Sequence, residues 1–211
     1  MNVKDYFIKL ASCGEQLLDQ APIERESQPL EYALQRLAPH LEQAKPEQLR
    51  RLKGLHRPAV EAGTSFEIGV GLNSIGMLTD RFTILIIKGW CLANKGKRDK
   101  ARARALYENQ TMDIIEAISR ARPGHSAMNS KITNIVSDAS AVTWEEAFYG
   151  LFTTNLLIWE SQEMLYVKDI GHAEYDELRS YIKWFSLSNI RRNGYIELCE
   201  KSYWAINESA S

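Results

Sequence analysis

Apolar residues recur three and four positions apart along most of the chain, which is the spacing of amphipathic helices. Strict alternation of apolar and polar residues, the pattern of a half-buried strand, does not occur over any length. We therefore expect an all-α protein, an antiparallel helical bundle whose long C-terminal helices are joined by short turns. The predicted helices cover residues 3–19, 29–44, 45–55, 74–93, 97–120, 127–136, 143–168 and 174–207.

Local signals place several helix ends. Pro39 is expected to kink or stop the second helix, because proline removes a backbone donor and crowds the preceding turn. Thr143 and Glu146 form a Thr-x-x-Glu capping box, which predicts the start of a helix. The proline-flanked segment 22–29 reads as a linker. We expect two parts, a helical extension at residues 1–64 and a helical-bundle core at residues 65–211.

Composition excludes several classes of function. The 211 residues are 45% hydrophobic and 25% charged, with a net charge of −1, so a dedicated nucleic-acid binder is not expected. The most apolar stretches, residues 83–93 and 148–159, are shorter than the ~20 residues a membrane span needs. The three cysteines are far apart, which favours a reducing, cytoplasmic location. The four histidines lack metal-ligand spacing, so no metal is expected, and no particular cofactor is indicated.

Three segments place polar residues on otherwise apolar helices. In a central helix such residues face other helices, and a buried arginine needs a carboxylate partner. One interpretation is a structural network in which Arg191 or Arg192 meets Asp80, Glu160 or Glu163. The other is a ligand cleft in which arginines hold an anion and a glutamate serves as acid or base. The candidate ligand-binding residues are Asp80, Arg81, Lys88, Trp159, Gln162, Asn189, Arg191 and Arg192, and the candidate catalytic residues are Glu160 and Glu163.

In these segments the chain resembles an uncharacterised family of bacterial all-helical domains that is associated with lipopolysaccharide and other cell-surface glycan genes. The resemblance covers about residues 75–200 and is carried by three motifs: Asp-Arg-x-Thr-Ile-Leu-x-x-Lys at 80–88, Trp-x-x-Gln-Glu at 159–163 and Asn-x-Arg-Arg at 189–192. The family has Glu-Asp where this chain has Gln162 and Glu163, so one carboxylate is missing here. The resemblance implies a bacterial protein and a glycan-related context, and it implies no particular reaction.

Two functions follow as hypotheses, and neither decides whether the protein is an enzyme. The first is binding of an anionic small molecule, a sugar nucleotide or phosphorylated sugar, in bacterial surface-glycan biosynthesis. The second is a non-catalytic adaptor or subunit of a larger assembly, which would dock a protein partner through residues 3–44. A third, an all-α nucleotide pyrophosphohydrolase, is disfavoured because Glu160 and Glu163 supply only one of the two acidic motifs that bind magnesium.

Overall fold

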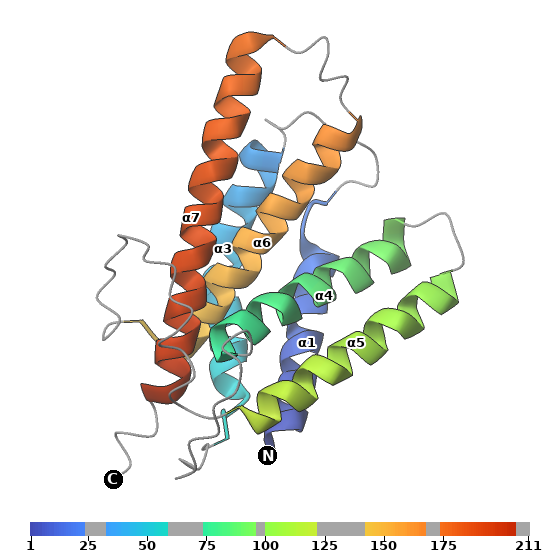
Figure 1. Ribbon diagram of the computed structural model, residues 1–211. Coiled ribbons are helices and arrows are strands. Elements are labelled where there is room, and N and C mark those ends of the chain that lie inside the picture. Colours follow the sequence, from blue (N-terminus) through green and yellow to red (C-terminus); the bar gives the residue numbers. More distant parts are fainter. Residues whose placement is uncertain (24–32, 59–73, 96–99, 122–141, 168–173, 206–211) are drawn as a thin grey trace.

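A computed structural model describes residues 1–23, 33–58, 74–95, 100–121, 142–167 and 174–205 (Figure 1). These ranges contain helices and no strand, which confirms the all-α prediction. The helices are α1 (Val3–Gln20), the short π-helix η1 (Ala33–Leu37), α3 (Ala38–Gly54), α4 (Ile75–Lys95), α5 (Lys100–Arg120), α6 (Trp144–Val167) and α7 (Tyr175–Ala205). The helix expected at 127–136 lies outside the described residues.

The helices form two antiparallel pairs that cross one another (Figure 1). Helix α4 runs beside α5, and α6 runs beside α7, as the order along the chain and the short connections predict. Helix α4 also contacts α1, α6 and α7, so it lies at the centre of the bundle. None of the described helices has an apolar stretch long enough to cross a membrane.

Aromatic side chains from four helices meet where the two pairs cross. Phe7 of α1 lies edge-on to Phe82 of α4, with ring centroids 5.4 Å apart. Trp144 of α6 contacts Tyr203 of α7 at 5.1 Å, and its indole N–H donates to the Tyr6 hydroxyl at 2.8 Å. All five side chains are almost completely buried. Such pairs stabilise beyond the area they bury, and here they join the first helix to the last.

Helix α1 thus contributes to the main core. Its Tyr6, Phe7, Leu10 and Leu18 are each 0% exposed and belong to the same apolar cluster as residues of α4, α6 and α7. The boundary expected near residue 64 falls outside the described residues. Among the described residues between 3 and 44, Ile8 is the large apolar side chain that stays exposed, at 46%, and could contribute to a docking surface.

The two helices expected at 29–44 and 45–55 are instead η1 followed by the continuous helix α3. Pro39 does not stop the helix: it lies in the first turn of α3, directly after the π-helix η1 ends at Leu37, so the helix changes type there and continues. Pro46 lies inside α3, whose Leu41 and Leu52 are buried in the core. This tertiary packing outweighs the local cost of an interior proline.

The predicted capping box is present at the start of α6. The Thr143 hydroxyl accepts from the Glu146 N–H at 3.3 Å, and the Glu146 carboxylate accepts from the Thr143 N–H at 2.9 Å. The bond from the Thr143 N–H, together with one that the Thr143 hydroxyl donates to the same carboxylate at 3.0 Å, lowers the pKa of Glu146 from its usual value. The capping box therefore fixes where α6 begins and orients the helix that carries Asn155 and Trp159.

Candidate functional site

A close approach of α4 and α7 positions the first polar cluster. Gly76 faces the backbone of α7, and a Cβ at this position would lie 2.3 Å from the carbonyl oxygen of Ile196. Only a glycine permits this contact. One turn further along α4 is Asp80, and one turn back along α7 is Arg192, so the same contact brings these two side chains together.

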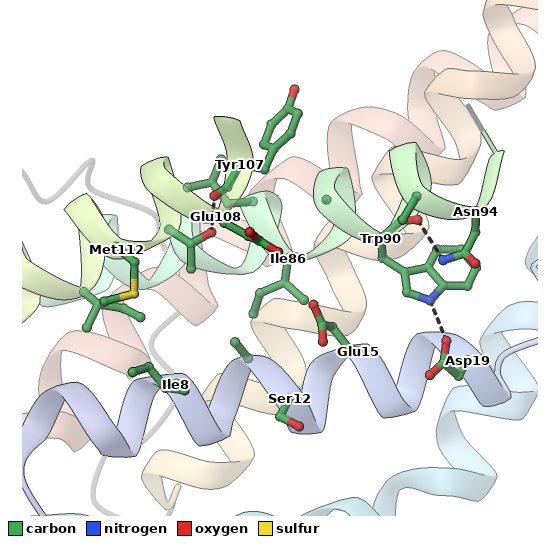
Figure 2. A pocket seen from close by; sticks show the side chains of 16 residues that line it. Ile8, Ser12, Glu15, Asp19, Ile86, Trp90, Asn94, Tyr107, Glu108 and Met112 are labelled. Atoms are coloured by element: carbon green, nitrogen blue, oxygen red, sulfur yellow. Dashed lines mark hydrogen bonds between the residues drawn. The ribbon is translucent and has the colours of Figure 1, made fainter. Parts of the chain in front are cut away.

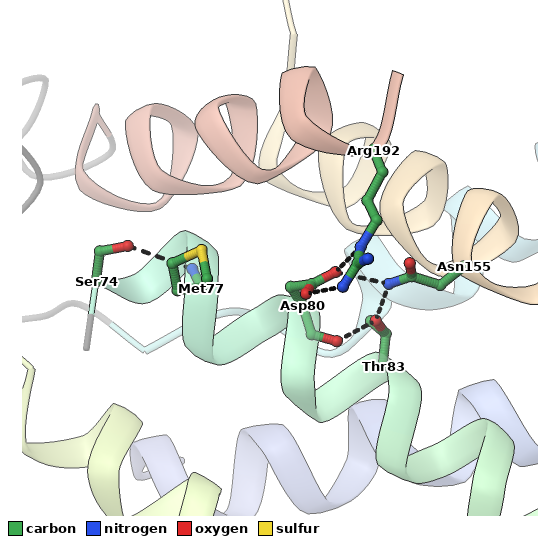
Figure 3. Close-up of polar contacts among 6 residues, drawn as sticks. All are labelled: Ser74, Met77, Asp80, Thr83, Asn155 and Arg192. Atoms are coloured by element: carbon green, nitrogen blue, oxygen red, sulfur yellow. Dashed lines mark hydrogen bonds and ion pairs between the residues drawn. The ribbon is translucent and has the colours of Figure 1, made fainter. Parts of the chain in front are cut away.

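Arg192 and Asp80 form a bidentate ion pair (Figure 3). The Arg192 Nε donates to Asp80 Oδ1 at 2.8 Å, and Nη2 donates to Oδ2 at 2.5 Å. The Asp80 side chain is 4% exposed and that of Arg192 is 27% exposed. The fork of a guanidinium matches the two oxygens of a carboxylate, which makes this one of the stronger geometries for an ion pair. The pairing of Arg192 with Asp80 was one of those expected from the sequence.

Asn155 of α6 and Thr83 of α4 complete the cluster. The Asn155 amide donates to Asp80 Oδ1 at 2.9 Å and to Thr83 Oγ1 at 2.8 Å, and that hydroxyl donates to the Asp80 carbonyl at 2.8 Å (Figure 3). Both residues are buried. Each of these four side chains thus has a partner within the protein, so the cluster holds three helices in register.

Glu200 links α7 to the first turn of α4. Its carboxylate accepts from the Gly76 N–H at 2.7 Å and from the Trp204 indole N–H at 2.8 Å. A carboxylate at a helix N-terminus satisfies a free donor and interacts favourably with the helix dipole. The neighbouring Cys199 is fully buried, and burial, aided by the nearby Asp80 and Glu200 carboxylates, raises the pKa of its thiol well above the usual value.

The predicted residues of α6 and α7 do not all meet at this cluster. Asn189 donates to the Phe185 carbonyl of its own helix at 3.0 Å, and Arg191 is exposed on α7. Glu160 is buried, whereas Glu163 is exposed, so the two candidate catalytic carboxylates lie in different environments. Gln162 is half-buried. The fold therefore does not place all the predicted residues in a single cleft.

Arg81 and Lys88 face a different space from Asp80. Both line an open hollow of about 420 Å³ between α4 and α5, which we call the basic hollow. The Lys88 ammonium lies 5.8 Å from the ring centroid of Trp159, a cation–π distance. The structure thus brings together three of the predicted ligand-binding residues. The basic hollow is lined by Arg81, Ile84, Leu85, Lys88, Gln110, Asp113 and Ile114.

Sequence reasoning missed the contribution of α5 to the basic hollow. Gln110 and Asp113 are three positions apart and precede Ile114, so they share a helix face that the sequence does show. Nothing in that spacing separates them from ordinary surface residues. Only the packing of α5 against α4 reveals that they lie opposite Arg81 and Lys88.

Among the described residues, no group of three or more histidine, cysteine, aspartate or glutamate side chains is arranged to hold a metal ion. Comparison with protein families, with characterised proteins and with solved structures gave no match. The resemblance to a glycan-associated helical family therefore stays a prediction.

Proposed function

We propose that this protein binds an anionic small molecule in the basic hollow between α4 and α5. The ligand class is a sugar nucleotide or a phosphorylated sugar, and the setting is bacterial surface-glycan biosynthesis. One observation carries the proposal: Arg81 and Lys88, two cations on a strongly apolar helix, line the same concavity.

The charges of the basic hollow differ from those of the Asp80 cluster. Arg192 is held by a carboxylate, but among the described residues Arg81 and Lys88 have no ion pair. Asp113 lines the same hollow and leaves it with a net charge of about +1 at neutral pH. Arginine binds two phosphate oxygens at once, and lysine adds a point charge. The Gln110 amide can donate to a sugar hydroxyl or a phosphate.

The volume and the apolar walls of the basic hollow limit the kind of ligand that it can hold. Its volume of about 420 Å³ is within the range of small-molecule sites, which is roughly 300–1,000 Å³. Ile84, Leu85 and Ile114 give it apolar walls against which the body of a ligand can pack. Glu160 and Glu163 are not part of its lining, so the proposal is for binding and includes no catalytic step.

Isothermal titration calorimetry with UDP-glucose, glucose 1-phosphate and glucose tests this proposal. We expect the two phosphorylated compounds to bind and glucose not to bind. Arg81→Ala and Lys88→Ala should each weaken binding about tenfold, since a charged hydrogen bond contributes about 1.5 kcal/mol or more. The matched control is Arg191→Ala, which removes an exposed arginine of α7 and should leave affinity unchanged.

Two results would overturn the proposal. One is equal binding of glucose and glucose 1-phosphate, because the charge would then contribute nothing. The other is an equal loss of affinity in Arg81→Ala and Arg191→Ala, which would indicate attraction by overall charge rather than a site. Circular dichroism of each variant confirms that it is folded.

A second candidate, an adaptor in a protein assembly, is favoured by a different observation. Helix α7 exposes large apolar side chains along its N-terminal half: Tyr175 is 76% exposed, and Ile182 and Leu187 are each 56% exposed. Exposed apolar side chains that gather on one element are typical of contact surfaces. A partner protein would thus dock on α7 rather than on residues 3–44. Failure of all three ligands to bind, together with a change in sedimentation coefficient caused by Ile182→Glu, would favour it over ligand binding.

A further inference from the structure

A second hollow lies between α1, α4 and α5, and it is larger than the basic hollow (Figure 2). Its volume is about 680 Å³, and only Leu85 lines both spaces. We call it the acidic groove. Its volume is in the range that a small organic molecule needs. It uses none of the residues that the proposed function assigns to anion binding, apart from that shared leucine.

The floor of the acidic groove is apolar. Leu85 and Ile86 of α4 line it together with Ile115 of α5 and Ala11 of α1. Ile86 and Ile115 are themselves buried in the core, at 5% and 1% exposure. The floor is therefore anchored in the core, and a ligand gains affinity there by removing apolar surface from water.

The charged residues in the described lining of the groove are all acidic. Glu15 and Asp19 of α1 are on one side and Glu108 of α5 is on the other, and no lysine or arginine is present in the described lining. A phosphate or carboxylate ligand would be repelled by the Asp19 carboxylate. A cation would be attracted, in contrast to the basic hollow, where cations line the wall.

Asp19 is held in position by an aromatic residue of α4. The Trp90 indole N–H donates to Asp19 Oδ1 at 2.8 Å (Figure 2), so the other oxygen of the carboxylate, Oδ2, is left for another donor. Trp90 and Tyr107 both line the groove. The faces of aromatic rings attract ammonium groups, so the ring and the carboxylate favour the same kind of ligand.

We propose that the acidic groove binds an organic cation, an ammonium group carried on an apolar ring-containing body. The apolar floor would take the ring, and Asp19 with Trp90 would take the ammonium group. A metal ion fits less well, because the carboxylates of the described residues do not gather into a metal-holding cluster. An apolar floor with the Asp19 carboxylate at its rim suits a ligand that has an apolar body and one ammonium group.

Thermal-shift measurements and calorimetry with tryptamine test the proposal. The comparison compounds are 3-methylindole, which has the ring without the charge, indole-3-propionate, which has the opposite charge, and spermidine, which has charge without a ring. We expect tryptamine alone to raise the melting temperature. Its affinity should fall as salt is added, because charges at the rim are screened.

Three variants separate the contributions. Asp19→Asn should weaken tryptamine binding about fivefold, the effect of losing one exposed ion pair. Ser12→Phe places a ring into the groove from an exposed position of α1 and should abolish binding while every charge is kept. Asp176→Asn on α7 is the matched control, since it removes an exposed carboxylate far along the chain from the groove and should have no effect.

Several outcomes would overturn the proposal. Equal binding of 3-methylindole would show an apolar site that does not select for charge. Equal binding of spermidine would show general attraction of cations to acidic residues, without a defined site. Unchanged tryptamine binding in Ser12→Phe would place the ligand elsewhere. Absence of any shift with tryptamine and with 2-phenylethylamine at millimolar concentration would remove the groove as an amine site. None of these results bears on anion binding at Arg81 and Lys88.

Discussion

Gly76 of α4 and Ile196 of α7 bring their two helices so close that a Cβ at residue 76 would lie 2.3 Å from the Ile196 carbonyl oxygen. The atom in the way belongs to the backbone, so it cannot rotate aside. This contact is one turn from the Asp80–Arg192 ion pair and directly beside the bond from the Gly76 N–H to Glu200. The polar cluster therefore depends on a glycine that has no chemistry of its own.

Gly76→Ala should lower the free energy of unfolding by about 1–3 kcal/mol, the usual cost of overpacking, since α4 and α7 must move apart. Gly54→Ala is the control, because nothing lies within 4 Å of a Cβ there. Urea unfolding followed by circular dichroism measures both. Equal stabilities of the two variants would contradict the close approach.

Arg192→Met should destabilise the protein by about 3 kcal/mol or more, because it leaves the buried Asp80 carboxylate without its partner. Asp80→Leu should cost less, since the Arg192 side chain is 27% exposed and can turn toward water. The double variant should be more stable than the sum of the two single losses predicts. Arg191→Met removes the exposed neighbour and should change stability little, and a large loss there would contradict this assignment.

Glu200→Gln should lower stability by about 1 kcal/mol, because a neutral amide interacts less well with the N-terminus of α4 than a carboxylate does. The change keeps the size of the side chain and one acceptor oxygen for the Gly76 N–H, but the amide NH2 cannot accept from the Trp204 indole N–H. Thermal unfolding at low and high salt measures the effect. Glu163→Gln, on an exposed residue of α6, is the control and should be neutral. An equal loss of stability in both variants would show that the change in net charge, and not the position of Glu200 at the N-terminus of α4, causes the effect.

The buried tyrosines should make the protein sensitive to alkali. Burial raises the pKa of Tyr203 from 10.0 to about 12, and burial also raises the pKa of Tyr6 and Tyr149. Above pH 10 the unfolded chain loses these protons while the folded protein keeps them, so unfolding becomes more favourable. The stability contribution is complete below pH 10 and is lost as the pH rises toward about 12.

Each such tyrosine should lower the free energy of unfolding by about 1.4 kcal/mol for every pH unit above 10, until its pKa in the folded protein is reached. Urea midpoints between pH 8 and 12 measure this slope. Tyr203→Phe should reduce it, whereas Tyr175→Phe should not, because Tyr175 is 76% exposed. Equal slopes in the two variants would show that Tyr203 titrates normally in the folded protein.

Much of the fold could be read from local sequence. The spacing of apolar residues located α1, α4, α6 and α7 to within a few residues, because burial on one side of a helix imposes its period on the sequence. The capping box at Thr143 and Glu146 placed the start of α6 correctly, since its bonds join residues three positions apart. The region around Pro39 and Pro46 was misread, because the packing of α3 outweighed its local propensity.

The candidate sites were harder to predict, because their members are far apart in sequence. Asp80 and Arg192 were expected to meet a charged partner, and that pairing followed from the cost of a lone buried charge. Arg81 is next to Asp80 in sequence but faces the basic hollow, since adjacent positions on a helix point about 100° apart. The acidic groove was not anticipated at all, because it combines residues of α1, α4 and α5.

The sequence by itself determined that the chain is helical, where most helices begin and end, and which charged residues interrupt apolar faces. These properties depend on contacts between residues a few positions apart. Only the tertiary structure decided that Asp80 and Arg192 pair with one another, that Arg81 and Lys88 form no ion pair with the other described residues, and that carboxylates of α1 and α5 flank one groove. Those outcomes depend on which helix faces meet, and that is set by the packing of the whole core.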